Sequence, residues 1–446
     1  MERHAANLLQ VYSVMIRQKL LSTFLLSLVI LPGPAVAQDT IRINGSNTLG
    51  DRIVPVLVEG WMKKFGYGQV TIARPKTGLK IVSAKRDTDS VEIEILGKGS
   101  RPGFQDLVNG DTEIAMMSRP LSAKEIDDGW QLGNLNSPDQ EHVIALQAIT
   151  PIVHPGNQIA GLDLSQLTKI ISGEITDWKQ LGGKPGKIRL HMARQGTGLA
   201  EMQATILNSS AAAPNSQRHR DSNEIRMAIA ADPNAIGIAE FSTSAGAFKA
   251  LPIRVANRLV PADQLHIKTE EYPLTRRLYF YTGQIVTALG RGFVTYAESE
   301  EAQRLLASHG YLSLAPMLTP VTQDKNLPAE YKQWVDGASR MSLSFRFGNA
   351  FSIFDSRGAQ DLARLKDFMQ RPENRNRKVI LIGHADKQSS IYMANSVSNE
   401  YADLVATSLM EIGISPMRVR GVGYSLPLTF TNNAVYRNRR VDVWLR

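Results

Sequence analysis

Residues 41–49 read Ile-Arg-Ile-Asn-Gly-Ser-Asn-Thr-Leu, and this stretch decides how the longer part of the chain folds. Ile41 and Ile43 alternate with Arg42, which predicts a short strand that opens on a Gly-Ser-x-Thr loop. From Arg52 to Phe65 apolar residues recur at helical spacing. N–H groups at a helix start attract an anion, and glycine permits its close approach. The stretch therefore predicts strand, anion-binding turn and helix, which is a unit of an α/β fold.

Three further turns have the same composition and stand between strand-like and helical runs. They are Gly97-Lys98-Gly99-Ser100-Arg101, Met117-Ser118-Arg119-Pro120 and Arg194-Gln195-Gly196-Thr197-Gly198. Each turn alone is weak evidence, because a Ser or Thr cap beside a glycine is common at helix starts. Four such turns, with Arg119 and Arg194 available to pair with an oxyanion, favour an anion-binding domain.

Four longer motifs carry a family resemblance from about Ile41 to Gly310. With the first loop, and in this order, they are Leu107 to Leu121, Ile170-Ile171-Ser172-Gly173-Glu174-Ile175-Thr176-Asp177-Trp178, Asp232 to Gly237 and Tyr272 to Arg276. This part resembles the phosphate-binding component of ABC importers. The resemblance implies a two-lobed type II periplasmic-binding-protein fold that closes on a tetrahedral oxyanion. The ligand contacts it implies are Thr48, Leu49, Ser100, Ser118, Arg119, Arg194, Thr197 and Gly198.

The fourth turn departs from the family pattern Arg-x-x-Gly-Ser-Gly-Thr. Arg194 lies one residue nearer the glycine, and Leu199 stands where a donor threonine is expected. Losing one hydroxyl from a buried anion site costs about 1–3 kcal/mol, which could re-tune the ligand. Arg218-His219-Arg220 could compensate, although we expect this cluster on an exposed loop.

The C-terminal part, about Ser342 to Arg446, has a second resemblance. Strand patterns at 343–347, 378–386, 419–424 and 437–444 alternate with helical patterns at 358–369 and 394–412, and the chain ends on Asn438-Arg439-Arg440-Val441. This order resembles an OmpA-like domain, so we expect a separate α+β domain of the βαβαββ type.

The second resemblance implies a peptidoglycan site. In this family an aspartate binds the ammonium of diaminopimelate, and an arginine on the next helix pairs with its carboxylate. Asp386 matches the aspartate, but Tyr401 occupies the arginine position, so recognition could be weaker, altered or taken over by a cation such as Lys387. Asn438, Arg439 and Arg440 are expected to brace the loop rather than to contact ligand.

The expected organisation is a signal peptide over 1–37, an oxyanion-binding domain over 38–313, a linker over 314–339 and the OmpA-like domain over 340–446. Arg17 and Lys19 precede an apolar run that ends at Ala35-Val36-Ala37, a small-x-small cleavage pattern. The chain has no cysteine, so it has neither a disulfide nor a lipidated cysteine. These features predict the periplasm of a Gram-negative cell, in association with the cell wall or outer membrane.

The positive charge is concentrated at one end. The formal charge is +9, and residues 340–446 hold sixteen Lys and Arg against nine Asp and Glu. Nucleic acid is the usual partner of such charge, but an exported protein seldom meets it. Anionic envelope polymers are the expected counter-surface, and a solvated basic face is the alternative.

Enzymatic signatures are missing from the sequence. There is no Gly-x-Ser-x-Gly elbow or His-Glu-x-x-His helix, and the histidines lack ligand-like spacing, so we expect no catalysis, metal or cofactor. The expected function is periplasmic oxyanion binding, with phosphate first, by a protein held at the wall. Its expected partners are the oxyanion, peptidoglycan, and an ABC permease or outer-membrane components. The alternatives are an envelope structural, adhesion or sensing protein without high affinity, and a phosphoester hydrolase.

Overall fold

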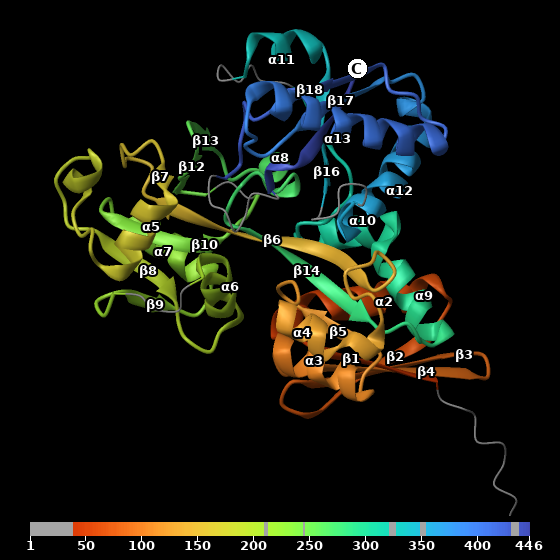
Figure 1. Cartoon of the computed structure of the whole chain (residues 1–446). Coiled ribbons are helices and arrows are strands. Elements are labelled where there is room, and N and C mark those ends of the chain that lie inside the picture. The colour runs from red at the N-terminus through yellow and green to blue at the C-terminus, as the bar shows by residue number, and fades with distance from the viewer. Residues whose placement is uncertain (1–38, 209–212, 244–245, 321–326, 348–353, 430–436) are drawn as a thin grey trace, which may run out of the picture.

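The chain folds into a two-lobed domain and a smaller C-terminal domain (Figure 1). The computed structural model describes residues 39–208, 213–243, 246–320, 327–347, 354–429 and 437–446, so the expected signal peptide lies outside the described residues. The expected fold class, a two-lobed α/β domain followed by a separate α+β domain, is confirmed.

The first lobe is built around the strand that carries the first loop. β1 lies between β4 and β5 and is parallel to both. Its apolar core is formed by Ile41 and Ile43 with side chains from α2 and α9. The elements of this lobe are β1 (Asp39–Gly45), η1 (Leu49–Ile53), α2 (Val54–Lys64), β2 (Gly68–Lys76), β3 (Leu79–Arg86), β4 (Asp89–Gly97), α3 (Ser100–Asn109), β5 (Ile114–Met117), α4 (Ala123–Asp128), η2 (Trp130–Leu132), α9 (Ala288–Glu298) and α10 (Glu300–Ser308).

The second lobe has its own apolar core. Trp178 belongs to this core and donates from Nε1 to the Asn234 carbonyl at 3.0 Å, which gives the Ile170–Trp178 motif a packing role. The elements are β7 (Leu162–Asp163), α5 (Leu164–Ser172), η3 (Trp178–Leu181), β8 (Arg189–Ala193), α6 (Gly198–Leu207), β9 (Gln217–His219), α7 (Ser222–Ala231), β10 (Ala235–Glu240), β11 (Lys249–Ala250), β12 (Ile253–Val255), β13 (Arg258–Val260) and α8 (Gln264–Lys268).

Two antiparallel strands, β6 (Glu141–Val153) and β14 (Thr275–Thr282), run from one lobe into the other (Figure 1). The part of β6 near Ile144 packs in the core of the first lobe, and Ile149 packs in the core of the second. The register of the pair shifts between Leu278 and Tyr279. These strands connect the lobes, and any rotation of one lobe against the other would use them as its hinge.

The C-terminal domain has a sheet in the order β15-β16-β19-β17-β18. From β16 onward the order of elements is the expected βαβαββ. They are β15 (Leu318–Pro320), α11 (Ala329–Trp334), β16 (Ser339–Arg346), α12 (Ser356–Gln370), η4 (Pro372–Asn374), β17 (Val379–His384), α13 (Ile391–Glu411), β18 (Arg418–Gly421) and β19 (Arg440–Leu445). The segment expected as a linker supplies β15, which pairs with β16, and α11, whose Tyr331 is buried against this sheet.

Candidate functional site

A cleft of about 1190 Å³ lies between the two lobes. Of the eight residues predicted to contact an oxyanion, Thr48, Thr197 and Gly198 line it directly. The cleft is bridged on one side by an ion pair between Arg52 and Glu240 at 2.8 Å. The first and fourth sequence turns therefore face each other across one space.

Backbone contacts fix the conformation of the first turn beside the cleft. Ser46 N donates to the Met116 carbonyl at 2.8 Å, and Gly45 has a φ of +138°. A Cβ on Gly45 would stand 2.2 Å from the Met116 oxygen, so only glycine fits there. Thr48 begins the helix that η1 and α2 form, Leu49 follows it with a fully buried side chain, and the Thr48 hydroxyl is buried without a hydrogen-bond partner.

The fourth turn meets the first across the cleft. Thr197 is the N-cap of α6, and Gly198 is the first residue of that helix. A Cβ on Gly198 would lie 3.9 Å from the Thr48 hydroxyl. The Thr197 hydroxyl accepts from Ala200 N at 3.2 Å and donates to the Arg194 carbonyl at 2.8 Å, so it serves its own helix. Two helix N-termini thus converge on one point.

Ser100 and Ser118 reach the cleft through a glutamate of the opposite lobe. Their hydroxyl oxygens are 3.2 Å apart, and Ser118 N donates to the Ser100 hydroxyl at 3.1 Å. The Ser118 hydroxyl then donates to Glu201 Oε1 at 3.2 Å. Glu201 lies in the first turn of α6 and lines the cleft, and sequence reasoning did not single it out.

The two predicted arginines are placed differently. Arg119 forms a bidentate ion pair with Glu125, with both contacts at 2.7 Å, and does not line the cleft. Although burial opposes ionisation, the hydrogen bonds from Arg119 and Ser122 lower the pKa of Glu125 to about 2. Arg194 is exposed and is also not among the lining residues.

Other arginines line the cleft or lie close to it. Arg218 in β9 and Arg220 just after it are exposed, as expected, and both line the cleft. Arg276 on β14 is 8% exposed and donates twice to Gln147 Oε1, at 2.7 and 3.1 Å, while its Nη1 is buried without a partner. Burial lowers the pKa of Arg276 to about 10, against the carboxylates of Glu201 and Glu240. Its charge therefore remains beneath the cleft at neutral pH.

The candidate peptidoglycan site lies at the end of β17. Asp386 accepts from Arg439 Nη2 at 3.0 Å and from Gln388 Nε2 at 2.8 Å. Tyr401 is 2% exposed, and its ring stacks on Phe347 with centroids 4.4 Å apart. Asn438 accepts from the backbone N–H of Leu428 and Thr429 and so braces that loop. Arg439 is thus the cation that stands beside Asp386.

Among residues 39–446, apart from the masked gaps, no group of three His, Asp or Glu side chains could hold a metal ion. None of the helices that the structure describes is long and apolar enough to cross a membrane.

Comparisons with known proteins identify both domains. Residues 69–301 match the family model of the PBP superfamily domain, and residues 345–440 match the OmpA family. The phosphate-binding protein PstS of Bacillus subtilis (strain 168) is 26% identical over 241 residues, which cover 54% of this chain and 76% of that protein.

Two solved structures resemble parts of the chain. An ABC-type phosphate transport receptor from Vibrio cholerae is 21% identical, with a TM-score of 0.48 over 62% of this chain and all of that one. The peptidoglycan-associated lipoprotein from Burkholderia pseudomallei is 18% identical, with a TM-score of 0.21 over 23% of this chain and 89% of that one.

Proposed function

The chain belongs to the PBP superfamily, and we propose that it binds an oxyanion, phosphate first, in the cleft between its lobes. Its C-terminal OmpA-family domain holds it at the peptidoglycan of a Gram-negative periplasm. The proposed role is binding without turnover. The curated relative that carries the name phosphate-binding protein supports the choice of ligand.

The observation that carries this proposal is the convergence of two helix N-termini on one point of the cleft. Thr48 begins one helix and Gly198 the other, and the Thr48 hydroxyl between them is buried without a partner. Each helix start contributes partial positive charge and N–H donors, which suit an anion. The buried charge of Arg276 adds to this field from below.

Glu201 narrows the class of ligand. Its carboxylate faces the hydroxyl chain of Ser118 and Ser100, at the edge of the space where an anion would sit. A fully ionised anion such as sulfate would meet a like charge there, which is destabilising in a partly buried site. An oxyanion that still carries a proton, such as hydrogen phosphate or arsenate, can donate it to Glu201. We therefore propose a protonated tetrahedral oxyanion as the ligand.

Titration calorimetry of the purified protein with phosphate, arsenate and sulfate tests the proposal. We expect phosphate and arsenate to bind, and sulfate to bind about tenfold more weakly or worse, because it cannot donate a hydrogen bond to Glu201. Thr48→Val removes the unpartnered hydroxyl and should weaken phosphate about tenfold, in line with the 1–3 kcal/mol of a lost buried hydrogen bond. Absence of binding by any of the three anions, after refolding to remove carried-over ligand, would sink the proposal. Turnover of a phosphoester would contradict its non-catalytic part.

We place the wall-binding function at Asp386 and Arg439. An amino-acid centre in a stem peptide carries both an ammonium and a carboxylate, which Asp386 and Arg439 can receive. Tyr401 lies in the core of the domain against Phe347 and carries no charge, so Arg439 takes the part expected of a cation there. Sedimentation with purified peptidoglycan tests this site. An ABC permease or an outer-membrane component remains a proposed further partner.

A second candidate function is an envelope structural, adhesion or sensing protein whose cleft binds no anion tightly. Arg119 pairs with Glu125, and the Thr197 hydroxyl donates to the Arg194 carbonyl. Both expected anion contacts thus have partners within the protein, which favours this second function. A protein that sediments with peptidoglycan and yet ignores every oxyanion would have this second function.

A further inference from the structure

The C-terminal domain packs against both lobes at once, on the side of the hinge away from the cleft. In Figure 1 it lies above β6 and β14, while the two lobes lie to the left and below. Neighbouring side chains of β14 show the same division. Arg276 contacts Gln147, which lines the cleft, whereas the next residue, Arg277, forms an ion pair with Asp355 of the C-terminal domain at 2.8 Å. Successive strand residues point to opposite faces.

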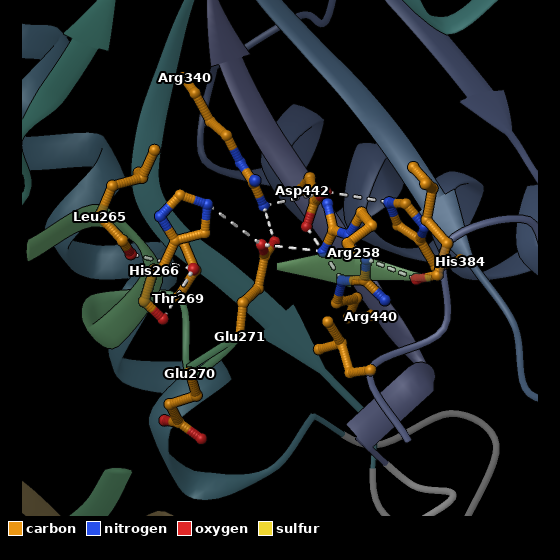
Figure 2. A network of polar contacts seen from close by, with 12 residues as sticks. Arg258, Leu265, His266, Thr269, Glu270, Glu271, Arg340, His384, Arg440 and Asp442 are labelled. Atoms are coloured by element: carbon orange, nitrogen blue, oxygen red, sulfur yellow. Dashed lines mark hydrogen bonds and ion pairs between the residues drawn. The ribbon is translucent and has the colours of Figure 1, made fainter. Parts of the chain in front are cut away.

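The contact with the second lobe is a buried network of charges (Figure 2). Glu271, just after α8, is 1% exposed and pairs with Arg340 of β16 and with Arg258 at 3.4 Å. Arg340 also pairs with Asp442 of β19 at 3.0 Å. The network therefore runs from the second lobe into the centre of the C-terminal sheet.

Glu270 forms the second half of this contact. It pairs with Arg277 at 2.7 Å and with Arg357 and Arg346 of the C-terminal domain. Although burial opposes ionisation, these arginines hold the pKa of Glu270 well below its ordinary value. Arg346 also donates to the Thr269 carbonyl at 2.6 Å. Removing one partner of such a pair leaves a buried charge alone, so separating the two domains is unfavourable unless water reaches these groups.

Helix α12, which carries Arg357, also makes the contact with the first lobe. Ser356 at its start hydrogen-bonds Glu141, Gln360 donates to Glu298 of α9, and Arg371 after its end pairs with Glu300 of α10 at 2.7 Å. From Arg357 to Arg371 the helix advances about 21 Å, at 1.5 Å per residue. α12 is therefore fixed to the second lobe at Arg357, and to the first lobe at Ser356, at Gln360 and, just past its end, at Arg371.

A rotation about β6 and β14 that opens the cleft would move the opposite surfaces of the lobes toward each other. The docked C-terminal domain occupies that place. We infer that this domain is a hinge lock: while docked it holds the cleft closed, and the lobes separate only when α12 loosens from one of them. Where it concerns anion exchange, the inference rests on the proposed function. By linkage, a ligand that favours the closed cleft also favours docking.

The lock can be tested without any ligand by measuring the distance between the lobes. Because the chain has no cysteine, introduced cysteines can be labelled selectively. Spin labels at Lys63→Cys on α2 and Met227→Cys on α7, both exposed, report the separation of the lobes by dipolar spectroscopy. Ser356→Ala, Gln360→Ala and Arg371→Glu together remove the three polar contacts of α12 with the first lobe and should shift the distances to longer values. Lys366→Glu, a charge reversal on the exposed face of α12, should leave them unchanged. Identical distributions in the released variant and the wild type would overturn the lock.

A second arm uses inorganic phosphate. Glu298→Cys and Gln360→Cys, joined by a short thiol cross-linker, fasten α12 to the first lobe, and release of labelled phosphate should then slow on the order of tenfold. An unchanged release rate would contradict the lock. If the wild type binds no phosphate but the lobes of the released variant still move apart, the lock stands and the proposed ligand is refuted.

Discussion

At the scale of single residues, we expect the ligand preference of the cleft to depend on a hydrogen-bond acceptor, the Glu201 carboxylate, as much as on its donors. Glu201 accepts from Ser118 across the two lobes, and this contact follows no pattern of loop motifs. We expect Glu201→Gln to narrow the preference for phosphate over sulfate by about ten- to a hundredfold, since a hydrogen bond to a charged group is worth roughly 1.5–3 kcal/mol. Calorimetry with both anions measures this ratio. An unchanged ratio would mean that Glu201 does not accept a hydrogen bond from the protonated ligand.

The wall site also depends on one cation. Arg439→Gln leaves Asp386 with its Gln388 contact but without an ion-pair partner. We expect this variant to lose most of its sedimentation with peptidoglycan. Arg420→Gln removes the same charge from an exposed position on β18 and serves as the matched control. Equal losses in the two variants would point to general charge attraction rather than to a site.

His384 makes stability depend on pH. It is 1% exposed and bonds Asp442 through Nε2 at 2.9 Å, and burial with the nearby Arg440 lowers its pKa to about 4. The unfolded chain takes up this proton near pH 6.5, whereas the folded protein resists until about pH 4. Stability should therefore be full above pH 6.5 and fall by up to about 3 kcal/mol toward pH 4. Denaturant unfolding of His384→Gln should show a shallower decline over this window, and equal slopes would contradict the assignment.

At the scale of elements, the strand and helix order of both domains could be predicted because hydrophobic period survives in the sequence. β5 coincides with the expected strand at Ile114–Met117, and α12 lies within two residues of the expected helix at 358–369. The direction of side chains at the turns could not be predicted. Arg119 turns to Glu125 because the capping box of α4 places that carboxylate beside it, six residues later. The predicted set of anion contacts stays a prediction.

The start of α6 explains one departure from the family pattern. Leu199 lines the cleft and also packs against apolar side chains of the second lobe, so it fills space that a threonine would leave. We expect Leu199→Thr to lower the free energy of unfolding by about 1–2 kcal/mol, while phosphate binds more tightly through the added hydroxyl. Thermal unfolding and calorimetry give the two values. Weaker binding in a stable variant would show that the hydroxyl does not reach the ligand.

At the scale of the whole molecule, the two domains behave as one structural unit rather than as a module on a flexible tether. The segment expected as a linker is part of the C-terminal sheet, and buried pairs such as Glu271 with Arg340 join the domains. Sequence patterns could not predict this interface, because charged residues in a sequence normally indicate solvent-exposed surface, whereas here they are buried.

The joined domains lead to a prediction about truncation. A protein that ends at Ser313 loses Arg340, Arg346 and Arg357, so Glu270 and Glu271 keep only the partners of their own lobe. We expect it to melt about 5 °C or more below the intact protein, since 1 kcal/mol shifts Tm by about 2–4 °C in a domain of this size. Calorimetry of the intact protein should show one transition for both domains. Two transitions, one of them at the Tm of the truncated protein, would mean that the interface adds nothing to stability and that the C-terminal domain cannot hold the hinge.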